Sequence, residues 1–227
     1  MKVDFPEPLN SLISGLENKA ITNFYGAPGT GKTNFCLFAA LDCIRKGGTV
    51  VFIDTEGGLS LERLKQLASD HETILSRMKI IEPKSFEEQG RIIRKLDGME
   101  ADMIIVDSMV ALYRLEYSEE MKKQERMGPV RELSKQLSVL SNIARTKDIP
   151  VFITAHMFRN WETKNPDVVG GDLMKYWSKT IIFLEKTNKM SERRATVMKH
   201  RFAPEGGNVK FELVNDGIKP SGFRIFR

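Results

Sequence analysis

The segment Gly26-Ala27-Pro28-Gly29-Thr30-Gly31-Lys32-Thr33 matches the pattern G-x-x-x-x-G-K-[ST] of a phosphate-binding loop. It follows a strand-like run, residues 21–25, and precedes a helical pattern that begins near Lys32. The glycines of such a loop let backbone N–H groups converge on a β-phosphate, while Lys32 reaches the β- and γ-phosphate oxygens and Thr33 offers its hydroxyl to Mg²⁺. The segment therefore predicts a site for ATP with Mg²⁺, and an ordinary glycine-rich turn is the alternative.

Apolar runs with β-branched residues alternate with amphipathic segments on both sides of this loop. The best amphipathic pattern is Leu133, Leu137, Leu140 and Ala144, whose spacing places one apolar stripe on a single helix face. Strands that alternate with helices predict an α/β fold, with a mostly parallel central sheet flanked by helices. The strand-like runs cover residues 21–25, 49–53, 78–81, 103–106 and 150–154.

The character of the sequence changes after Gly170-Gly171. Three β-like runs, residues 180–184, 195–198 and 209–214, are separated by polar stretches rich in Lys, Arg, Asn and Gly, which is typical of an antiparallel edge. No internal repeat or Pro/Gly-rich linker divides the sequence. We therefore expect one domain over residues 1–227, with residues 1–15 as a short N-terminal lead-in.

Composition excludes some classes of protein and leaves others open. Of the 227 residues 41% are hydrophobic, which suits one α/β domain, and the apolar stretches fall short of the roughly 20 residues that a membrane span needs. The N-terminus has an early acid and two prolines where an export signal needs an apolar segment, so a cytoplasmic location is expected. A formal charge of +5 tolerates a polyanionic partner without requiring one.

The two cysteines, Cys36 and Cys43, lie seven residues apart in one predicted helix. They share a helix face about two turns apart, which is too far for a disulfide without distortion. We expect both to be buried free thiols.

A second chemical feature stands at the end of the apolar run at residues 103–106. Asp107 comes directly after this run, at the carboxyl end of a predicted strand. A phosphate-binding loop needs a carboxylate to manage its metal, so Asp107 is expected to hold Mg²⁺ through a water, with Ser108 supporting the same shell. An acid that caps a helix is the alternative.

Two strand-like runs, residues 49–53 and 78–81, lie between Lys32 and Asp107. At least one strand is therefore expected between the phosphate-loop strand and the strand that ends at Asp107. The first of these runs ends in Asp54-Thr55-Glu56, which places Glu56 at the sheet edge where the phosphates bind. Glu56 is the candidate general base that orients and deprotonates the attacking water, and a solvated loop acid is the alternative.

Several segments of the sequence resemble a known protein family. The stretch FIDTEGGLSLERL, residues 52–64, resembles the RecA-like recombinases, most closely the archaeal RadA and eukaryotic strand-exchange proteins. The match continues through residues 104–108, 131–137 and 170–172. The resemblance implies a RecA-like P-loop ATPase core over nearly the whole chain. The small size is similar to a short archaeal paralogue of this family, without a separate N-terminal DNA-binding domain.

The resemblance implies roles for particular residues of the nucleotide site. Glu56 matches the catalytic glutamate of the family and acts with Lys32. Arg63 matches an arginine laid against the adenine, and a planar guanidinium stacked on a base is physically reasonable. Asn34, directly after the loop, is included in the expected nucleotide-binding set.

The sequence also departs from the family pattern. The family has a glutamine that senses the γ-phosphate after the strand at residues 151–154, and this sequence has His156 there. A histidine can still bond a phosphate, and a histidine satisfied near the core is the alternative. Phe5 lacks the surrounding F-x-x-A pattern that docks a neighbouring subunit in the family, so a homo-oligomer stays open and long filaments are not expected.

The triplet Lys199-His200-Arg201 resembles cations that related ATPases insert into a neighbour's site, where they neutralise transition-state charge. Three interpretations stay open: Lys199 and Arg201 act as a finger in trans, they contact a nucleic-acid backbone, or they lie at a solvated strand end. The turn at residues 186–189 with Arg193-Arg194 is a further basic patch, for which an ordinary charged turn is favoured.

The family's DNA contacts come from two loops, which map here to residues 109–128 and 157–171. Both combine cations with aromatic residues, a combination that holds phosphates and stacks on unpaired bases. Acidic residues dilute the first loop, so the second is favoured. The candidate DNA-binding residues are Arg159, Trp161, Lys164, Arg114, Lys122 and Lys123.

These features predict an ATP-binding accessory protein of DNA repair and homologous recombination, with weak ATPase activity and little strand exchange of its own. The expected partners are DNA, preferably single-stranded, and a RadA-type recombinase or a junction nuclease, with no membrane. A KaiC-like regulatory ATPase that acts on protein partners without DNA is the alternative. A small-molecule kinase ranks lower, because such kinases usually need an Arg-rich lid and an acceptor pocket.

Overall fold

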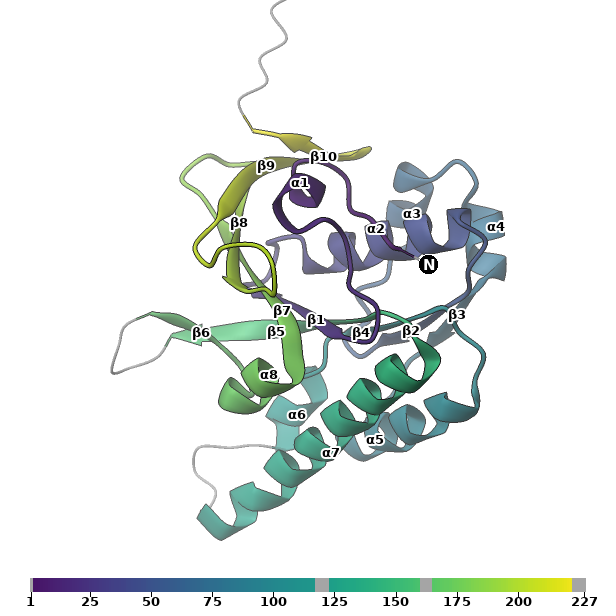
Figure 1. Ribbon diagram of the computed structural model, residues 1–227, viewed down its shortest axis with the longest axis vertical. Helices are drawn as coiled ribbons and strands as arrows, with labels where there is room; N and C mark the ends of the chain where they lie inside the picture. Colours follow the sequence, from purple (N-terminus) through teal and green to yellow (C-terminus); the bar gives the residue numbers. More distant parts are fainter. Residues whose placement is uncertain (1, 117–122, 160–164, 222–227) are drawn as a thin grey trace, which may run out of the picture.

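The computed structural model describes residues 2–116, 123–159 and 165–221, with the backbone alone at residues 123–126 (Figure 1). The helices are α1 (Leu9–Ile13), α2 (Lys32–Arg45), α3 (Leu61–Leu67), α4 (His71–Ser76), α5 (Phe86–Lys95), the 3₁₀ turn η1 (Leu96–Gly98), α6 (Ala111–Glu116), α7 (Lys123–Lys147) and α8 (Gly171–Trp177). The strands are β1 (Ile21–Gly26), β2 (Val50–Asp54), β3 (Met78–Ile81), β4 (Met103–Asp107), β5 (Val151–Arg159), β6 (Pro166–Val168), β7 (Ser178–Lys186), β8 (Glu192–Lys199), β9 (Asn208–Val214) and β10 (Gly217–Pro220).

One sheet runs through the described chain in the order β10-β9-β8-β7-β1-β5-β4-β2-β3, and β6 pairs with β5. The pairs from β7 to β3 are parallel, whereas β8, β9 and β10 add to β7 in antiparallel fashion. The predicted fold class is therefore confirmed, including its antiparallel C-terminal edge. All the predicted strands are present, and the predicted helix after the phosphate loop begins at Lys32.

A strand does lie between β1 and β4, but it is β5, which follows β4 in the sequence. The strands β2 and β3, which fill the interval between Lys32 and Asp107, lie beyond β4 instead. The number of residues between Lys32 and Asp107 indicates how many strands lie between them in the sequence, but it does not determine the order of strands in the sheet. Each helical crossover can place the next strand on either side of the strand before it. The consequence for the site is that the end of β5 lies beside both β1 and β4.

Helices cover the two faces of the parallel part of the sheet (Figure 1). The helices α2, α3 and α4 lie on one face, and α5, α6, α7 and α8 lie on the other. Each face of the sheet has its own hydrophobic core: the first core lies on the side of α2, and the second core lies on the side of α5 and α7. Because neighbouring residues of a strand point to opposite faces, Ile105 packs in the first core and Ile104 in the second. A continuous apolar run in the sequence therefore supplies both cores. The predicted stripe of α7 is confirmed, since Leu133, Leu137, Leu140 and Ala144 are fully buried.

The N-terminal lead-in contributes Phe5 to the first core. Its ring lies 5.4 Å from that of Phe24 and 5.8 Å from those of Phe35 and Phe152, measured between centroids, and its exposed fraction is 5%. Aromatic rings at such distances stabilise a core beyond the area that they bury. Phe5 is therefore held in this chain's own core rather than presented to a neighbour.

The two segments expected to be DNA-binding loops are more regular than the sequence predicts. The described part of residues 109–128 contains α6 and the start of α7, and that of residues 157–171 contains an antiparallel ribbon in which β6 pairs with the end of β5. The strands β6 and β10 were not predicted, because both are short and contain Pro or Gly, which are typical of turns. Cys36 and Cys43 are buried free thiols, as predicted. No helix in the described ranges is both long and apolar enough to cross a membrane.

Candidate nucleotide-binding site

The phosphate loop joins the end of β1 to the start of α2. Gly29 and Gly31 have φ angles of +73° and +102°, in the left-handed region that favours glycine. Helix α2 begins at Lys32 with Gly31 as its N-cap, so the first N–H groups of the helix have no partner within it. The Thr30 hydroxyl donates to the Ala27 carbonyl over 2.8 Å and holds the loop closed from within. This loop can bind an anion through main-chain donors at a helix N-terminus.

Lys32 lies inside the loop rather than in solvent. Its exposed fraction is 8%, and its ammonium donates to the carbonyl oxygens of Gly26 and Ala27 over 3.1 and 3.2 Å. Burial lowers the pKa of Lys32, and nearby Glu56 and Asp107 oppose that effect. An ammonium has three donors, and the loop carbonyls take two of them. The third is available to a phosphate oxygen.

Asp107 ends β4 beneath the loop and is held by two hydroxyl groups. Thr33 donates to one carboxylate oxygen over 2.6 Å, and Thr154 of β5 donates to the other. Burial raises the pKa of Asp107 despite these bonds. The Ser108 hydroxyl is buried without a hydrogen-bond partner among the described residues. Within the described ranges no group of three or more His, Cys, Asp or Glu is placed to hold a metal ion.

The turn that carries Glu56 is fixed by the last residue of β2. Asp54 is buried, and its carboxylate accepts hydrogen bonds from the backbone N–H groups of Glu56, Gly58 and Leu59 over 2.9 to 3.2 Å. Thr55 ties this turn to the end of β4, because its hydroxyl accepts from the Ser108 N–H over 2.9 Å and donates to the Ser108 carbonyl over 2.8 Å. The position of Glu56 is therefore set by two neighbouring strands.

Glu56 and His156 form a pair across the site. His156 Nε2 lies 2.8 Å from Glu56 Oε1, and the histidine stands on β5, which lies beside the strand of Asp107. The hydrogen bond with His156 is the main reason why the pKa of Glu56 falls from 4.5 to about 2, against a smaller opposing effect of burial. A carboxylate with such a low pKa is a weak base. The pair therefore restrains the group that the sequence assigns to water activation.

Replacing His156 by Ala should raise the pKa of Glu56 from about 2 toward the ordinary 4.5. Because the folded-state pKa is depressed, the pair stabilises the fold fully above about pH 4.5, and this contribution is lost as the pH falls toward 2. A carbon NMR titration of the Glu56 carboxyl group measures its pKa in the wild type and in His156→Ala. The variant His71→Ala, on α4, should leave the titration unchanged, and an unchanged pKa in His156→Ala would contradict the assigned cause.

One cavity of about 280 Å³ collects these groups. It is lined by Pro28, Gly29, Gly31, Lys32, Thr33, Asn34, Glu56, Asp107, His156 and Leu213. Glu56 and His156 also line an adjoining cavity of about 290 Å³ with Ala111, Arg114 and Leu115. The pair thus lies between the phosphate loop and helix α6, which carries a candidate DNA-binding residue.

Arg63 and Asn34 lie together at the far side of the loop. Arg63 Nε donates to Asn34 Oδ1 over 2.7 Å, and its other nitrogens donate to the carbonyls of Asn215 and Val214 over 2.7 and 3.2 Å. The guanidinium plane is therefore fixed between α2, α3 and the end of β9. A planar cation held in this way is suited to stack on a base.

Lys199 and Arg201 are both engaged within this chain. The ammonium of Lys199 donates to the carbonyls of Lys175 and Ser178 over 2.7 and 2.8 Å, at the C-terminal end of α8. Arg201 lies 3.2 Å from the Glu17 carboxylate. A cation is favourable at the C-terminus of a helix, so these contacts give Lys199 a role inside its own chain.

The candidate DNA-binding residues are only partly described. Arg114 is exposed on α6, and Arg159 is exposed at the end of β5, where its backbone pairs with Pro166. Trp161, Lys164 and Lys122 lie outside the described residues, and for Lys123 only the backbone at the start of α7 is described.

Three residues of the site were not predicted from the sequence. Thr154 binds Asp107 but reads as an ordinary strand residue, and Asp54 was noted only as part of the segment that carries Glu56. Leu213 lies 3.3 Å from the position that a Cβ on Gly31 would occupy, yet it is far away in the sequence. A polar residue at the end of each parallel strand is the signal that could have found the first two.

The mostly parallel sheet, the phosphate loop after β1 and the acids at the ends of β2 and β4 define the class of RecA-like P-loop proteins. Comparison with known proteins narrows this class. Residues 7–221 match the model of the Rad51 family. The "DNA repair and recombination protein RadB" of Methanococcus maripaludis strain C5 is 42% identical over 214 residues, covering 93% of this chain and 96% of that protein. The protein of the same name from Methanobrevibacter smithii is 37% identical over 92% of this chain and 91% of its own length.

Comparison with a solved structure indicates the same family. The crystal structure of the RadB recombinase superposes with a TM-score of 0.79 at 34% identity and covers 93% of this chain and 96% of that chain. The chain therefore belongs to the Rad51 family, in its RadB group. The resemblance to RecA-like recombinases and to their short archaeal paralogue is confirmed.

Proposed function

We propose that this chain is an ATP-binding accessory protein of DNA repair and homologous recombination, with weak ATP hydrolysis of its own. The observation that carries the proposal is the bond of 2.6 Å between the Thr33 hydroxyl and Asp107, inside a cavity that Lys32 and Glu56 also line. These two oxygen groups stand where a phosphate loop needs its metal. The role in DNA repair rests on the names of the RadB relatives.

The residues present fit Mg²⁺ and ATP. Thr33 and Asp107 offer hard oxygen donors, the unpartnered Ser108 hydroxyl can bond a metal-bound water, and Mg²⁺ commonly takes one or two protein oxygens together with phosphates. When bound, Mg²⁺ would neutralise the charge that develops on the phosphates. Lys32 would supply its third N–H to the phosphate oxygens, and Asn34 with Arg63 would hold the base.

The pair of Glu56 and His156 supports weak rather than rapid hydrolysis. His156 occupies Oε1 of the Glu56 carboxylate, and a carboxylate with a pKa of about 2 accepts protons poorly. His156 can exchange Glu56 for a phosphate oxygen, since an imidazole nitrogen bonds either group. ATP binding is then more important than ATP turnover. The change at the pair when ATP binds is transmitted toward Arg114 through the cavity that the pair shares with α6.

The DNA-binding part of the proposal is tested by a gel shift with single-stranded DNA at two salt concentrations. We expect binding at low salt that weakens steeply as salt rises, because lysines and arginines on phosphates release counterions. The double variant Arg114→Ala/Arg159→Ala should bind more weakly. Lys79→Ala, which removes an exposed cation of the edge strand β3, serves as the control. Absence of binding at low salt would favour a regulatory ATPase that acts on proteins alone. A RadA-type recombinase or junction nuclease is the partner to test next.

A further inference from the structure

The turn between β7 and β8 lies against the outer side of the phosphate loop. Arg193 Nε donates to the Gly29 carbonyl over 3.1 Å. Lys186 is the cross-strand partner of Arg193, and its Nζ lies 3.2 Å from the position that a Cβ on Gly29 would occupy. Two cations from one hairpin therefore meet the tip of the loop that binds phosphate.

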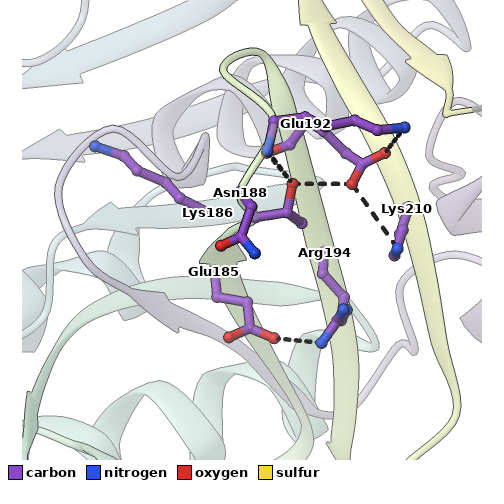
Figure 2. A pocket seen from close by; sticks show the side chains of 8 residues that line it. Glu185, Lys186, Asn188, Glu192, Arg194 and Lys210 are labelled. Carbon is purple, nitrogen blue, oxygen red and sulfur yellow. Dashed lines mark hydrogen bonds and ion pairs between the residues drawn. The ribbon is translucent and has the colours of Figure 1, made fainter.

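The charges of this hairpin are distributed unevenly between its two faces. On one face Arg194 pairs with Glu185 at 3.2 Å, and Glu192 pairs with Lys189 and Lys210 (Figure 2). Figure 2 shows Lys186 directed away from these pairs. On the loop face, Arg193 and Lys186 have no carboxylate within 4.0 Å among the described residues. Like charges directly opposite each other on a sheet are unfavourable, so an anion nearby would explain their placement.

The bond to the Gly29 carbonyl also fixes a donor on the other side of the loop. The peptide bond between Gly29 and Thr30 is trans, so the Gly29 C=O and the Thr30 N–H point in opposite directions. Because Arg193 holds the carbonyl on the outside, the Thr30 N–H is directed to the inside. A charge-assisted bond to the carbonyl also polarises the peptide and strengthens that donor.

The guanidinium is itself held in place by the hairpin. Arg193 Nη1 donates to the carbonyls of Met190 and Glu192 over 2.9 and 3.0 Å. Glu192 is 3% exposed, and hydrogen bonds from Ser221 and Thr187 lower its pKa to about 2, so it stays ionised at the base of the turn. Arg193 therefore reaches the loop from a braced support rather than from a mobile side chain.

We propose that Arg193 is a positioning residue for the phosphate loop, which orients its inward N–H donors toward a nucleoside di- or triphosphate, and that Lys186 adds a second cation. This inference rests on the proposed function, because it needs a phosphate chain in the loop. Arg193 acts through the backbone and from within the same chain. Arg193 therefore affects the affinity for the phosphates of the nucleotide and not the affinity for its base.

The test compares Arg193→Met with Arg194→Met by calorimetry, using MgATP, MgADP and inorganic triphosphate with magnesium. Both variants remove one cation from β8, but Arg194 faces away from the loop and pairs with Glu185. We expect Arg193→Met to weaken all three ligands about tenfold and Arg194→Met to leave them within about twofold. Arg193→Lys should recover part of the affinity, since a lysine can still donate to the Gly29 carbonyl.

A purely structural role would lower the melting temperature of the ligand-free protein and would not follow the phosphates, so both variants are also melted without ligand. Lys186→Met, at an exposed side chain, gives a second test: affinity should fall about threefold at low salt and less at high salt. Equal affinities in Arg193→Met, Arg194→Met and wild type would overturn the inference and leave the proposed function intact. Failure of the wild type to bind MgATP would overturn both.

Discussion

Replacing Glu56 by Gln is expected to lower ATP hydrolysis by a factor on the order of 100 or more, with MgATP affinity within about twofold of wild type. The amide keeps the shape of the carboxylate and can still accept a hydrogen bond from His156, but it cannot take a proton from water. The measurement is single-turnover hydrolysis of radiolabelled ATP, because the wild-type rate itself is expected to be low.

The control for this substitution is Glu62→Gln. Glu62 is exposed on α3, close in sequence to Glu56, and its replacement removes the same charge without touching the cavity. It should hydrolyse ATP as the wild type does. If Glu56→Gln hydrolysed ATP at the wild-type rate, Glu56 would not be the general base, and the water would have to be activated elsewhere.

Replacing Lys32 by Ala should weaken MgATP binding by about 100-fold, which corresponds to roughly 2.7 kcal/mol. The lysine is 8% exposed and donates to two carbonyls of the loop, so its loss removes the charge that faces the phosphates and the bonds that close the loop. Equilibrium binding of a fluorescent ATP analogue, with and without competing ATP, measures the change.

Lys65→Ala is the matched control for this second substitution, because Lys65 is exposed on α3 and lies outside the cavity lining. It should bind MgATP with wild-type affinity. Similar affinities in Lys32→Ala and the wild type would mean that ATP does not occupy the phosphate loop.

The parts of the site that could be predicted from the sequence are those that depend on short-range patterns. The loop from Gly26 to Thr33 needs only eight consecutive residues, and the strand before it and the helix after it follow from local periodicity. Asp107 and Glu56 were proposed because each stands near the carboxyl end of an apolar strand, and the carboxyl ends of parallel strands meet at one edge. The structure brings both acids to the cavity that Lys32 lines.

The parts that could not be predicted depend on the order of strands and on long-range contacts. The sequence does not show that β5 lies between β1 and β4 in the sheet. This strand order brings Thr154 into contact with Asp107 and His156 into contact with Glu56. The bond between Arg193 and Gly29 joins residues 164 positions apart. From sequence alone Arg193 belongs to a charged turn, and only the packing of β8 on β7 beside β1 gives it a place at the phosphate loop.

The structure also changes the weight of the three interpretations of Lys199 and Arg201. Both cations have partners in their own chain, at the end of α8 and at Glu17. A finger in trans would have to give up these contacts when subunits associate. The contacts within the chain therefore favour a structural role for Lys199.

The central claim is that main-chain donors, one lysine and one magnesium ion hold ATP at the start of α2. Titration calorimetry of the purified protein with ATP and with ADP, in magnesium and then in EDTA, tests it most directly. We expect saturable binding of one nucleotide per chain in magnesium and much weaker binding in EDTA. Absence of heat from both nucleotides in magnesium, with folding confirmed on the same sample, would contradict the claim.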